Sequence, residues 1–186
     1  MRIISGTFKG KKIYPPIDFN TRPLKDLVKE SIFNIIEHSK KFEIKIEETF
    51  VLDLFSGVGS FGLECLSRGS KFVTFVENYN GVLPILKKNL INLKSVKNYK
   101  IIEKDIINNF NFNLLDQKYN LIFLDPPYKE KNLSSLLNII NEKKILSKEG
   151  IIIMHRHKKQ IDKFPKNLKI FEEKKYGLSK IIFGSI

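Results

Sequence analysis

The sequence predicts an α/β protein with a doubly wound, mostly parallel sheet of seven strands. Three observations support this fold class: apolar runs of strand length alternate with helical patterns from residue 49 onward, a glycine-rich turn follows the first run, and acidic residues follow successive runs. Such alternation is typical of a parallel sheet with helices on both faces. Ligands of these sheets bind beyond the carboxyl ends of the strands, so the residues there are the candidates for a site.

Two pieces precede this alternating region. Residues 1–20 are predicted to form a small basic β-hairpin, because RIISGTFKGKKIY alternates around two glycines and ends at two prolines. Residues 21–48 are predicted to be a helical lead-in, since Thr21 is a suitable N-cap, Pro23 falls in the first turn, and apolar residues follow at helical spacing. We expect a single domain, 1–186, in which residues 49–186 form the α/β core.

The core is expected to run strand, helix, strand along the chain. Five strands are predicted at 49–55, 71–77, 100–105, 119–125 and 150–155, and helices are predicted at 60–69, 84–94 and 133–146. Two final strands, 168–176 and 179–186, are joined at Tyr176–Gly177 and therefore form a hairpin.

The formal net charge of +13 is concentrated at the two ends of the chain. Residues 1–29 carry seven basic and two acidic side chains (+5), and residues 155–180 carry nine basic and three acidic ones (+6). Basic ends favour a polyanionic partner through counterion release, although part of the excess follows from a chain that is rich in Lys throughout. No apolar run reaches membrane-spanning length, no secretory signal is seen, and Cys65 stands alone, so we expect a cytoplasmic protein.

The turn after the first predicted strand fits a dinucleotide site only in part. Gly57, Gly59 and Gly62 match G-x-G-x-x-G, a pattern that lets a ligand approach the backbone at a helix N-terminus but that also serves a plain tight turn. Asp53 precedes this turn, where a carboxylate would repel a pyrophosphate and attract an ammonium group. The pattern therefore favours a ligand with an ammonium group, and an NAD-binding oxidoreductase domain is the distant alternative.

Two more acids follow the next two predicted strands. Glu77 can accept hydrogen bonds from ribose hydroxyls, and Asp105 can accept from an exocyclic amine. Each alone also fits an ordinary strand end or turn. Together with Asp53 and the glycine turn, they predict a nucleoside-binding edge of the sheet.

The fourth acidic strand end is Asp125-Pro126-Pro127-Tyr128. Two prolines end the strand and stiffen the corner that follows it. A rigid carboxylate and the carbonyl of Pro126 can accept from the two N–H groups of one amine, while the ring of Tyr128 stacks on a flat base. This corner is predicted to hold the exocyclic amine of a nucleobase.

These motifs resemble those of the class I S-adenosylmethionine-dependent methyltransferases, with VLDLFSGVGSFG as the cofactor loop and DPPY as the amino-methylating signature. More narrowly, the chain is similar to the bacterial RsmD family, which methylates N2 of a guanine in 16S ribosomal RNA. The resemblance rests on RIISGTFKGKKI, TRPLKDLVKESIFNI, VLDLFSGVGSFGLECLSRGS, FVE, NLIFLDPPY and KKYGLSKIIF. The chain departs from the family at NYNGVLPILKKN and at IIIMHRH, which lacks the acid often found after the fifth strand. An amino-methyltransferase for adenine N6, or for guanine N2 of another RNA or DNA, is the near alternative.

The resemblance implies roles for individual residues. The methionine part of the cofactor would lie against Asp53, Phe55, Gly57 and Gly59, its ribose against Glu77 and its adenine against Asp105. Thr21, Arg22 and Pro23 would close over the methionine end or the target base. Catalysis would fall to Asp125, Pro126, Pro127 and Tyr128, and RNA contacts to Arg2, Lys9, Lys11, Lys12 and Arg22.

The partner implied by the resemblance is ribosomal RNA, free or within the small ribosomal subunit, and the protein would act as a monomer. No metal is expected. His155 and His157 have strand spacing, for which a solvated or basic-face role is more usual than metal ligation.

Overall fold

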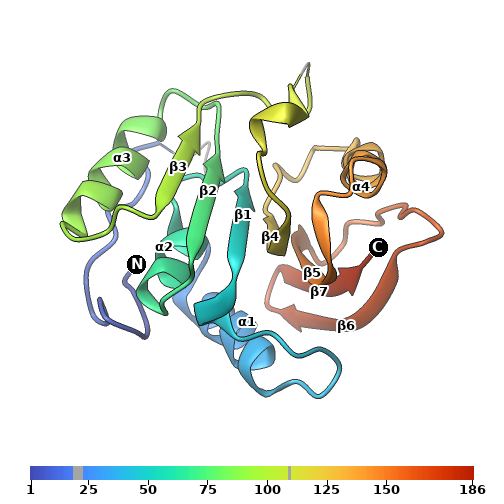
Figure 1. The fold of residues 1–186 in the computed structure, drawn as a ribbon, viewed down its shortest axis with the longest axis horizontal. Coiled ribbons are helices and arrows are strands. Elements are labelled where there is room, and N and C mark those ends of the chain that lie inside the picture. The colour runs from blue at the N-terminus through green and yellow to red at the C-terminus, as the bar shows by residue number, and fades with distance from the viewer. Residues whose placement is uncertain (19–22, 109) are drawn as a thin grey trace.

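The computed structural model describes residues 1–18, 23–108 and 110–186. Within these ranges seven strands form one sheet in the order β3-β2-β1-β4-β5-β7-β6 (Figure 1). Strands β1 to β5 pair in parallel, whereas β7 runs antiparallel to both of its neighbours, β5 and β6. The predicted fold class is therefore confirmed.

The elements follow the predicted order along the chain. The strands are β1 (Phe50–Leu54), β2 (Phe72–Val76), β3 (Tyr99–Ile102), β4 (Tyr119–Leu124), β5 (Leu146–His157), β6 (Lys169–Tyr176) and β7 (Ser179–Ser185). The helices are α1 (Asp26–His38), α2 (Ser60–Ser67), α3 (Leu83–Asn92) and α4 (Leu133–Glu142), with short 3-10 turns η1 (Ile46–Glu48) and η2 (Phe112–Leu114).

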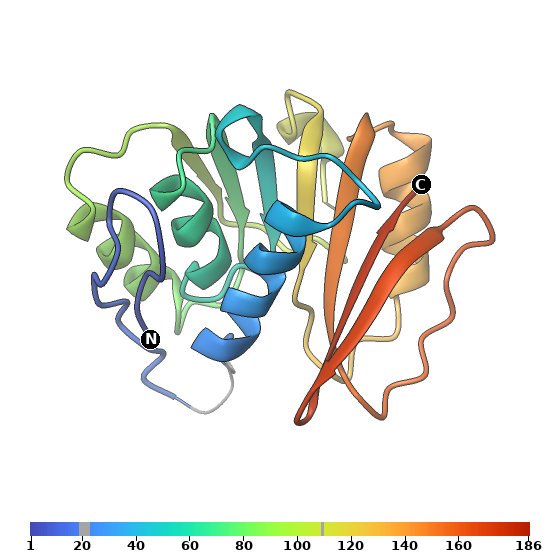
Figure 2. The same ribbon diagram turned by 90° about the horizontal axis from the view of Figure 1, so that it is seen from below.

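Helices cover both faces of the sheet (Figure 2). Side chains alternate along a strand, so in β1 Val51 packs towards α1, α2 and α3, whereas Leu52 and Leu54 pack towards α4. Phe61 of α2 stacks on Phe123 of β4, with ring centroids 4.1 Å apart. The same alternation turns Asp53, two residues after Val51, towards α2.

The N-terminal segment folds back on itself with less regular pairing than the predicted hairpin. Arg2 and Lys12 form an isolated antiparallel bridge. The N–H of Ile3 donates to the carbonyl of Lys11 at 2.9 Å, and the carbonyl of Ile3 accepts from the N–H of Gly10 at 2.8 Å. No longer ladder forms within residues 1–18, because backbone N–H groups there donate to α2 instead, as Thr7 does to the carbonyl of Ser67 at 2.7 Å.

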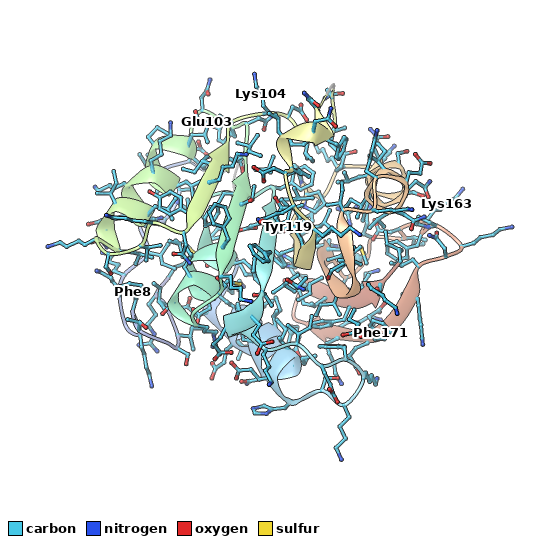
Figure 3. The ribbon with its side chains drawn as sticks, viewed as in Figure 1. Phe8, Glu103, Lys104, Tyr119, Lys163 and Phe171 are labelled. Atoms are coloured by element: carbon cyan, nitrogen blue, oxygen red, sulfur yellow. The ribbon has the colours of Figure 1, made fainter. Side chains whose placement is uncertain are left out.

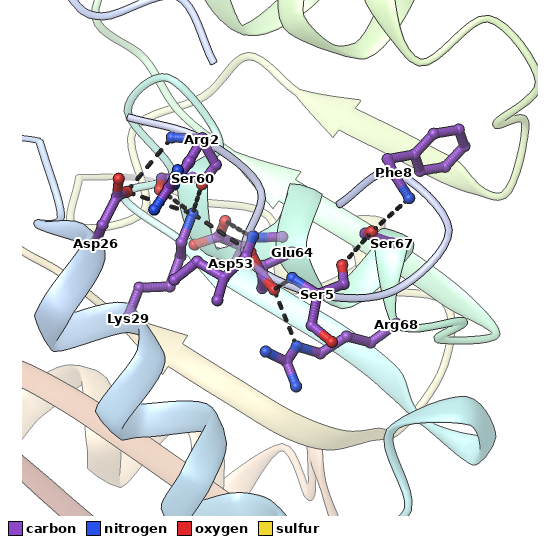
Figure 4. Close-up of polar contacts among 12 residues, drawn as sticks. Arg2, Ser5, Phe8, Asp26, Lys29, Asp53, Ser60, Glu64, Ser67 and Arg68 are labelled. Atoms are coloured by element: carbon purple, nitrogen blue, oxygen red, sulfur yellow. Dashed lines mark hydrogen bonds and ion pairs between the residues drawn. The ribbon is translucent and has the colours of Figure 1, made fainter. Parts of the chain in front are cut away.

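A buried ionic cluster around Glu64 anchors this segment (Figure 4). The carboxylate of Glu64 accepts from the N–H groups of Ile4 and Ser5 at 2.8 and 2.9 Å, and from Nε of Arg68 at 3.0 Å. Nζ of Lys29 lies 3.4 Å from Glu64, and both side chains are fully buried. Burial lowers the pKa of Lys29, although Glu64 opposes that shift. Helices α1 and α2 and the N-terminal segment are thereby tied together.

Several predicted boundaries are wrong. Helix α4 ends at Glu142 instead of 146, and β5 begins at Leu146 and ends at His157 instead of spanning 150–155. Helix α1 begins at Asp26 after an extended Lys25, so Pro23 precedes the helix instead of lying in its first turn. Thr21, the predicted N-cap, lies outside the described residues. Strand β3 ends at Ile102, so Asp105 lies three residues beyond the strand end that it was predicted to occupy.

Candidate active site

A cavity of about 430 Å³ opens at the carboxyl ends of β1, β2 and β4. Strand β1 is flanked by β2 on one side and β4 on the other, so the cavity lies at the point where the strand order reverses, the usual ligand position in such sheets. Its walls are Pro23, Leu24, Asp53, Phe55, Ser56, Gly57, Val58, Ser60, Phe61, Glu77, Asn78, Tyr79, Phe123, Asp125, Pro126, Pro127 and Tyr128.

Most predicted site residues meet in this cavity, but not all. Gly59 and Asp105 are absent from its walls, and Thr21 and Arg22 lie outside the described residues. Asn78 and Tyr79 were not predicted to line it, although their position directly after Glu77 was a usable signal.

Asp53 is a buried carboxylate with little compensation. Its side chain is 1% exposed and accepts one hydrogen bond from the residues that the structure describes, the N–H of Gly62 in α2 at 3.0 Å. Burial raises the pKa of Asp53 well above its ordinary value; the Gly62 hydrogen bond opposes this, and the nearby charges of Asp125 and Glu77 add to it. A cation in the cavity would relieve this unfavourable environment.

Glu77 binds the glycine turn itself. Its Oε2 accepts from the N–H of Gly57 at 2.7 Å, and its Oε1 accepts from Asn78 and Tyr79, both at 2.9 Å. A pyrophosphate bound at this turn would need a hydrogen bond from the N–H of Gly57. That N–H already donates to the carboxylate of Glu77. This geometry argues against a dinucleotide phosphate site.

Two predicted cofactor residues that do not line the cavity have clear local contacts. Gly59 has a φ of +84° immediately before α2, and a Cβ there would lie 2.5 Å from Leu86, so the glycine allows a tight turn over α3. Asp105 accepts from the N–H of Ile107 at 2.8 Å and from Asn108, both main chain and side chain. Although its partial burial acts to raise the pKa of Asp105, these hydrogen bonds lower it overall, as in a turn-capping carboxylate.

The Asp-Pro-Pro-Tyr corner lies at the end of β4, as predicted. The N–H of Asp125 donates to Leu54 of β1 at 3.3 Å, and Pro126 is buried while Pro127 is exposed. Arg156, fully buried in β5, donates through Nη2 to the carbonyl of Glu130 at 3.0 Å, which holds the loop that follows the corner.

Comparisons with known proteins agree with this geometry. A family model described as Conserved hypothetical protein 95 matches residues 1–185. The chain is 33% identical to YlbH of Bacillus subtilis, covering 97% of this chain and 96% of that one. It is 32% identical to ribosomal RNA small subunit methyltransferase D of Buchnera aphidicola, covering 92% and 86%. The structure of Escherichia coli yhhF superposes with a TM-score of 0.77 at 28% identity, covering 99% and 96%.

The chain belongs to the RsmD family. The membership predicted from the sequence is thus confirmed, and with it a methyltransferase that uses S-adenosylmethionine.

One expectation for this RsmD-family chain is wrong. His155 is 3% exposed, so it is not a solvated histidine of a basic face. Its Nδ1 lies 2.9 Å from Oδ1 of Asp125, and its Nε2 lies 2.8 Å from Oγ of Ser179. Sequence spacing gave no signal for this contact, which joins residues 30 positions apart. Within the described ranges, no group of three or more His, Cys, Asp or Glu side chains is arranged to hold a metal ion.

The predicted RNA contacts lie on the N-terminal segment. Arg2, Lys9 and Lys12 are exposed, Lys11 is half-buried with Nζ 5.5 Å from the ring centre of Phe8, and Arg22 is outside the described residues. At the other basic end of the chain, Lys163 extends outward from the loop between β5 and β6 (Figure 3). Among the described helices, none is both long enough and apolar enough to cross a bilayer.

Proposed function

We propose that this chain methylates N2 of a guanine in small-subunit ribosomal RNA, with S-adenosylmethionine as the methyl donor. Ribosomal RNA as the substrate is supported by the relative named ribosomal RNA small subunit methyltransferase D. The choice of an amino group is supported by the Asp-Pro-Pro-Tyr corner in the wall of the cavity.

The observation that carries the proposal is the charge of the cavity. The chain has a net charge of +13, yet three carboxylates, Asp53, Glu77 and Asp125, face one cavity, and the charges of Asp125 and Glu77 add to the raised pKa of Asp53. S-adenosylmethionine brings an ammonium and a sulfonium group, and it supplies the methyl group as an electrophile. An acidic cavity suits such a cation, whereas it disfavours the pyrophosphate of a dinucleotide.

The wall residues fit this cofactor with distinct tasks. Asp53 would bind the ammonium, because it is the buried carboxylate with the least compensation. Glu77 would accept from the ribose hydroxyls with the lone pairs that the backbone N–H groups leave, while those N–H groups fix its orientation. Pro23 and Tyr79 would enclose the ligand, since both lie in the cavity wall.

The corner would hold the nucleophile. A guanine N2 amine is a poor nucleophile, because its lone pair is delocalised into the ring. The two N–H groups of this amine would donate hydrogen bonds to Asp125 and to the carbonyl of Pro126. These hydrogen bonds would favour a more tetrahedral nitrogen and so localise its lone pair. An N–C bond then forms as the C–S bond breaks, and the surplus proton leaves towards Asp125; most of the acceleration comes from positioning. Tyr128 would stack on the base.

Methyl transfer with labelled cofactor tests the proposal. Small-subunit ribosomal RNA, assembled small subunits, other RNA and DNA would each be supplied, and the products digested to nucleosides. We expect label in N2-methylguanosine from ribosomal RNA. Label in N6-methyladenosine, or label only in DNA, would replace the proposal with the near alternative. Calorimetry with NAD and with S-adenosylmethionine distinguishes the proposed function from the oxidoreductase alternative. The alternative requires that the protein binds NAD and does not bind S-adenosylmethionine.

A further inference from the structure

We infer that His155 is a positioning residue that orients the carboxylate of Asp125 for the amine, assisted by Ser179. The inference rests on the proposed function, because it assigns a task to a neighbour of the proposed catalytic group. The contacts of His155, its burial and the pairing of the strands carry it.

The strand order brings these groups together. Strand β5 lies between β4 and β7 and continues to His157, beyond the 150–155 predicted from the sequence. In this strand His155 lies beside the corner that follows β4, and its Nε2 is 2.8 Å from the hydroxyl of Ser179, the first residue of β7. The imidazole is therefore fixed between two strands that both flank its own.

Hydrogen-bond chemistry determines which groups donate and which accept in the contacts between Ser179, His155 and Asp125. An ionised carboxylate only accepts, so the inferred role requires a proton on Nδ1 of His155 that is donated to Oδ1 of Asp125. Nε2 then meets the hydroxyl of Ser179, a group that can either donate or accept, so this contact is satisfied in either ring state. One oxygen of Asp125 is committed to His155, which leaves the other for the substrate amine.

The two residues after His155 contact the same corner. Arg156 donates to the carbonyl of Glu130 at 3.0 Å and approaches that of Pro127 at 3.5 Å. The ring of His157 lies edge-on to Tyr128, with centroids 5.0 Å apart. Three consecutive residues of β5 thus brace the side chain of Asp125, the backbone of the loop and the aromatic ring.

A buried histidine that only filled space would have a different mutational signature. A space-filling role predicts that any substitution lowers stability and that activity follows stability. A positioning role predicts loss of the methyl-transfer step with cofactor affinity retained, and recovery when a donor is restored at the position of Nδ1. The amide nitrogen of Asn stands about as far from the backbone as Nδ1 of His, so Asn is the conservative variant.

The test compares His155→Leu and His155→Asn with the wild type, with His38→Leu as the matched control because His38 is exposed on α1. We would measure single-turnover methyl transfer, calorimetric affinity for S-adenosylhomocysteine and the melting temperature. We expect His155→Leu to slow transfer roughly 100-fold with cofactor affinity unchanged, as for a displaced catalytic group. His155→Asn is expected to recover most of that loss, and His38→Leu to match the wild type.

Nitrogen NMR of the imidazole rings tests the contact without any substrate. We expect a proton on Nδ1 of His155 in the wild type, with its resonance displaced in Asp125→Asn. An unprotonated Nδ1, a folded His155→Leu variant with wild-type transfer, or equal losses in the Leu and Asn variants would overturn the inference. If the wild type methylates no nucleic acid, the proposed function fails, whereas the NMR result still decides whether His155 holds Asp125.

Discussion

Replacing Asp53 by Asn should stabilise the fold while weakening cofactor binding. The carboxylate is 1% exposed, has one hydrogen bond at 3.0 Å and lies near two other acids. Asn keeps an acceptor for the N–H of Gly62 and removes the charge. A desolvated polar group without full compensation costs about 1–3 kcal/mol, so we expect a gain of that order at neutral pH. For a chain of this length, each kcal/mol corresponds to roughly 2–4 °C in Tm.

The gain should depend on pH in a defined direction. The pKa of Asp53 is raised in the folded state, mainly by burial, so the folded protein holds this proton more tightly than the unfolded chain does. The contribution of Asp53 to stability is therefore present below its ordinary pKa and is lost as the pH rises through the raised folded value. The stability difference between Asp53→Asn and the wild type should grow as the pH rises above the ordinary pKa of an aspartate, about 4, and should level off only above the raised folded pKa.

Urea unfolding at several pH values measures this difference, and calorimetry measures cofactor binding. Loss of one charged contact to the ammonium should weaken S-adenosylmethionine binding about 10- to 100-fold. Asp116→Asn is the control, because that side chain is 67% exposed and its removal should change stability by less than about 0.5 kcal/mol. A variant that is less stable than the wild type at pH 8, a gain independent of pH, or unchanged cofactor affinity would refute the reasoning.

Three further predictions concern the corner and the N-terminal segment. Asp125→Ala should lower methyl transfer at least about 100-fold in a nucleoside assay while cofactor affinity in calorimetry is retained, since one acceptor of the amine is lost. Neutralising the exposed Lys9 and Lys12 to Gln should weaken RNA binding and reduce the slope of log affinity against log salt by about one unit per phosphate contact in filter binding. Gly6→Ala should cost about 1–3 kcal/mol and speed tryptic cleavage of the segment, because φ is +79° and a Cβ would lie 1.9 Å from the carbonyl oxygen of Ser67.

Each of these has a control or a contrary outcome. Wild-type transfer by Asp125→Ala would exclude the amine-holding role. Lys143 and Lys144 follow α4, at the opposite end of the sheet from the N-terminal segment in both ribbon views, so their neutralisation is the matched control for charge. An unchanged salt slope for the Lys9 and Lys12 variant would remove that segment from the RNA contacts. Gly10 has a φ of +82° and open space around the position of a Cβ, so Gly10→Ala introduces backbone strain without a steric clash. Comparison with Gly6→Ala therefore separates the cost of the strain from the cost of the clash.

The identity of the elements and much of the site could be predicted from local patterns. Strand-length apolar runs predicted β1, β2 and β4, and residues at or just beyond the carboxyl ends of parallel strands meet at one edge of the sheet, which is why Asp53, Glu77 and Asp125 share a cavity. The two prolines of the corner restrict their own backbone, so the end of the strand and the stiff corner could be predicted without knowledge of any tertiary contact. Asp105 does not line this cavity, because β3 ends at Ile102 and the carboxylate accepts hydrogen bonds within its own turn.

Tertiary structure alone decided the contacts between distant segments. The N-terminal residues were expected to pair with each other, but Glu64 and Ser67 of α2 took several of their N–H groups. His155 looked like a surface residue, because spacing along β5 cannot reveal that β4 and β7 flank that strand. Sequence periodicity determines which face a side chain takes; which partners it meets, and whether water reaches it, depends on strand order and packing. The acids at the strand ends therefore followed from sequence, whereas the histidine that holds one of them followed only from the fold.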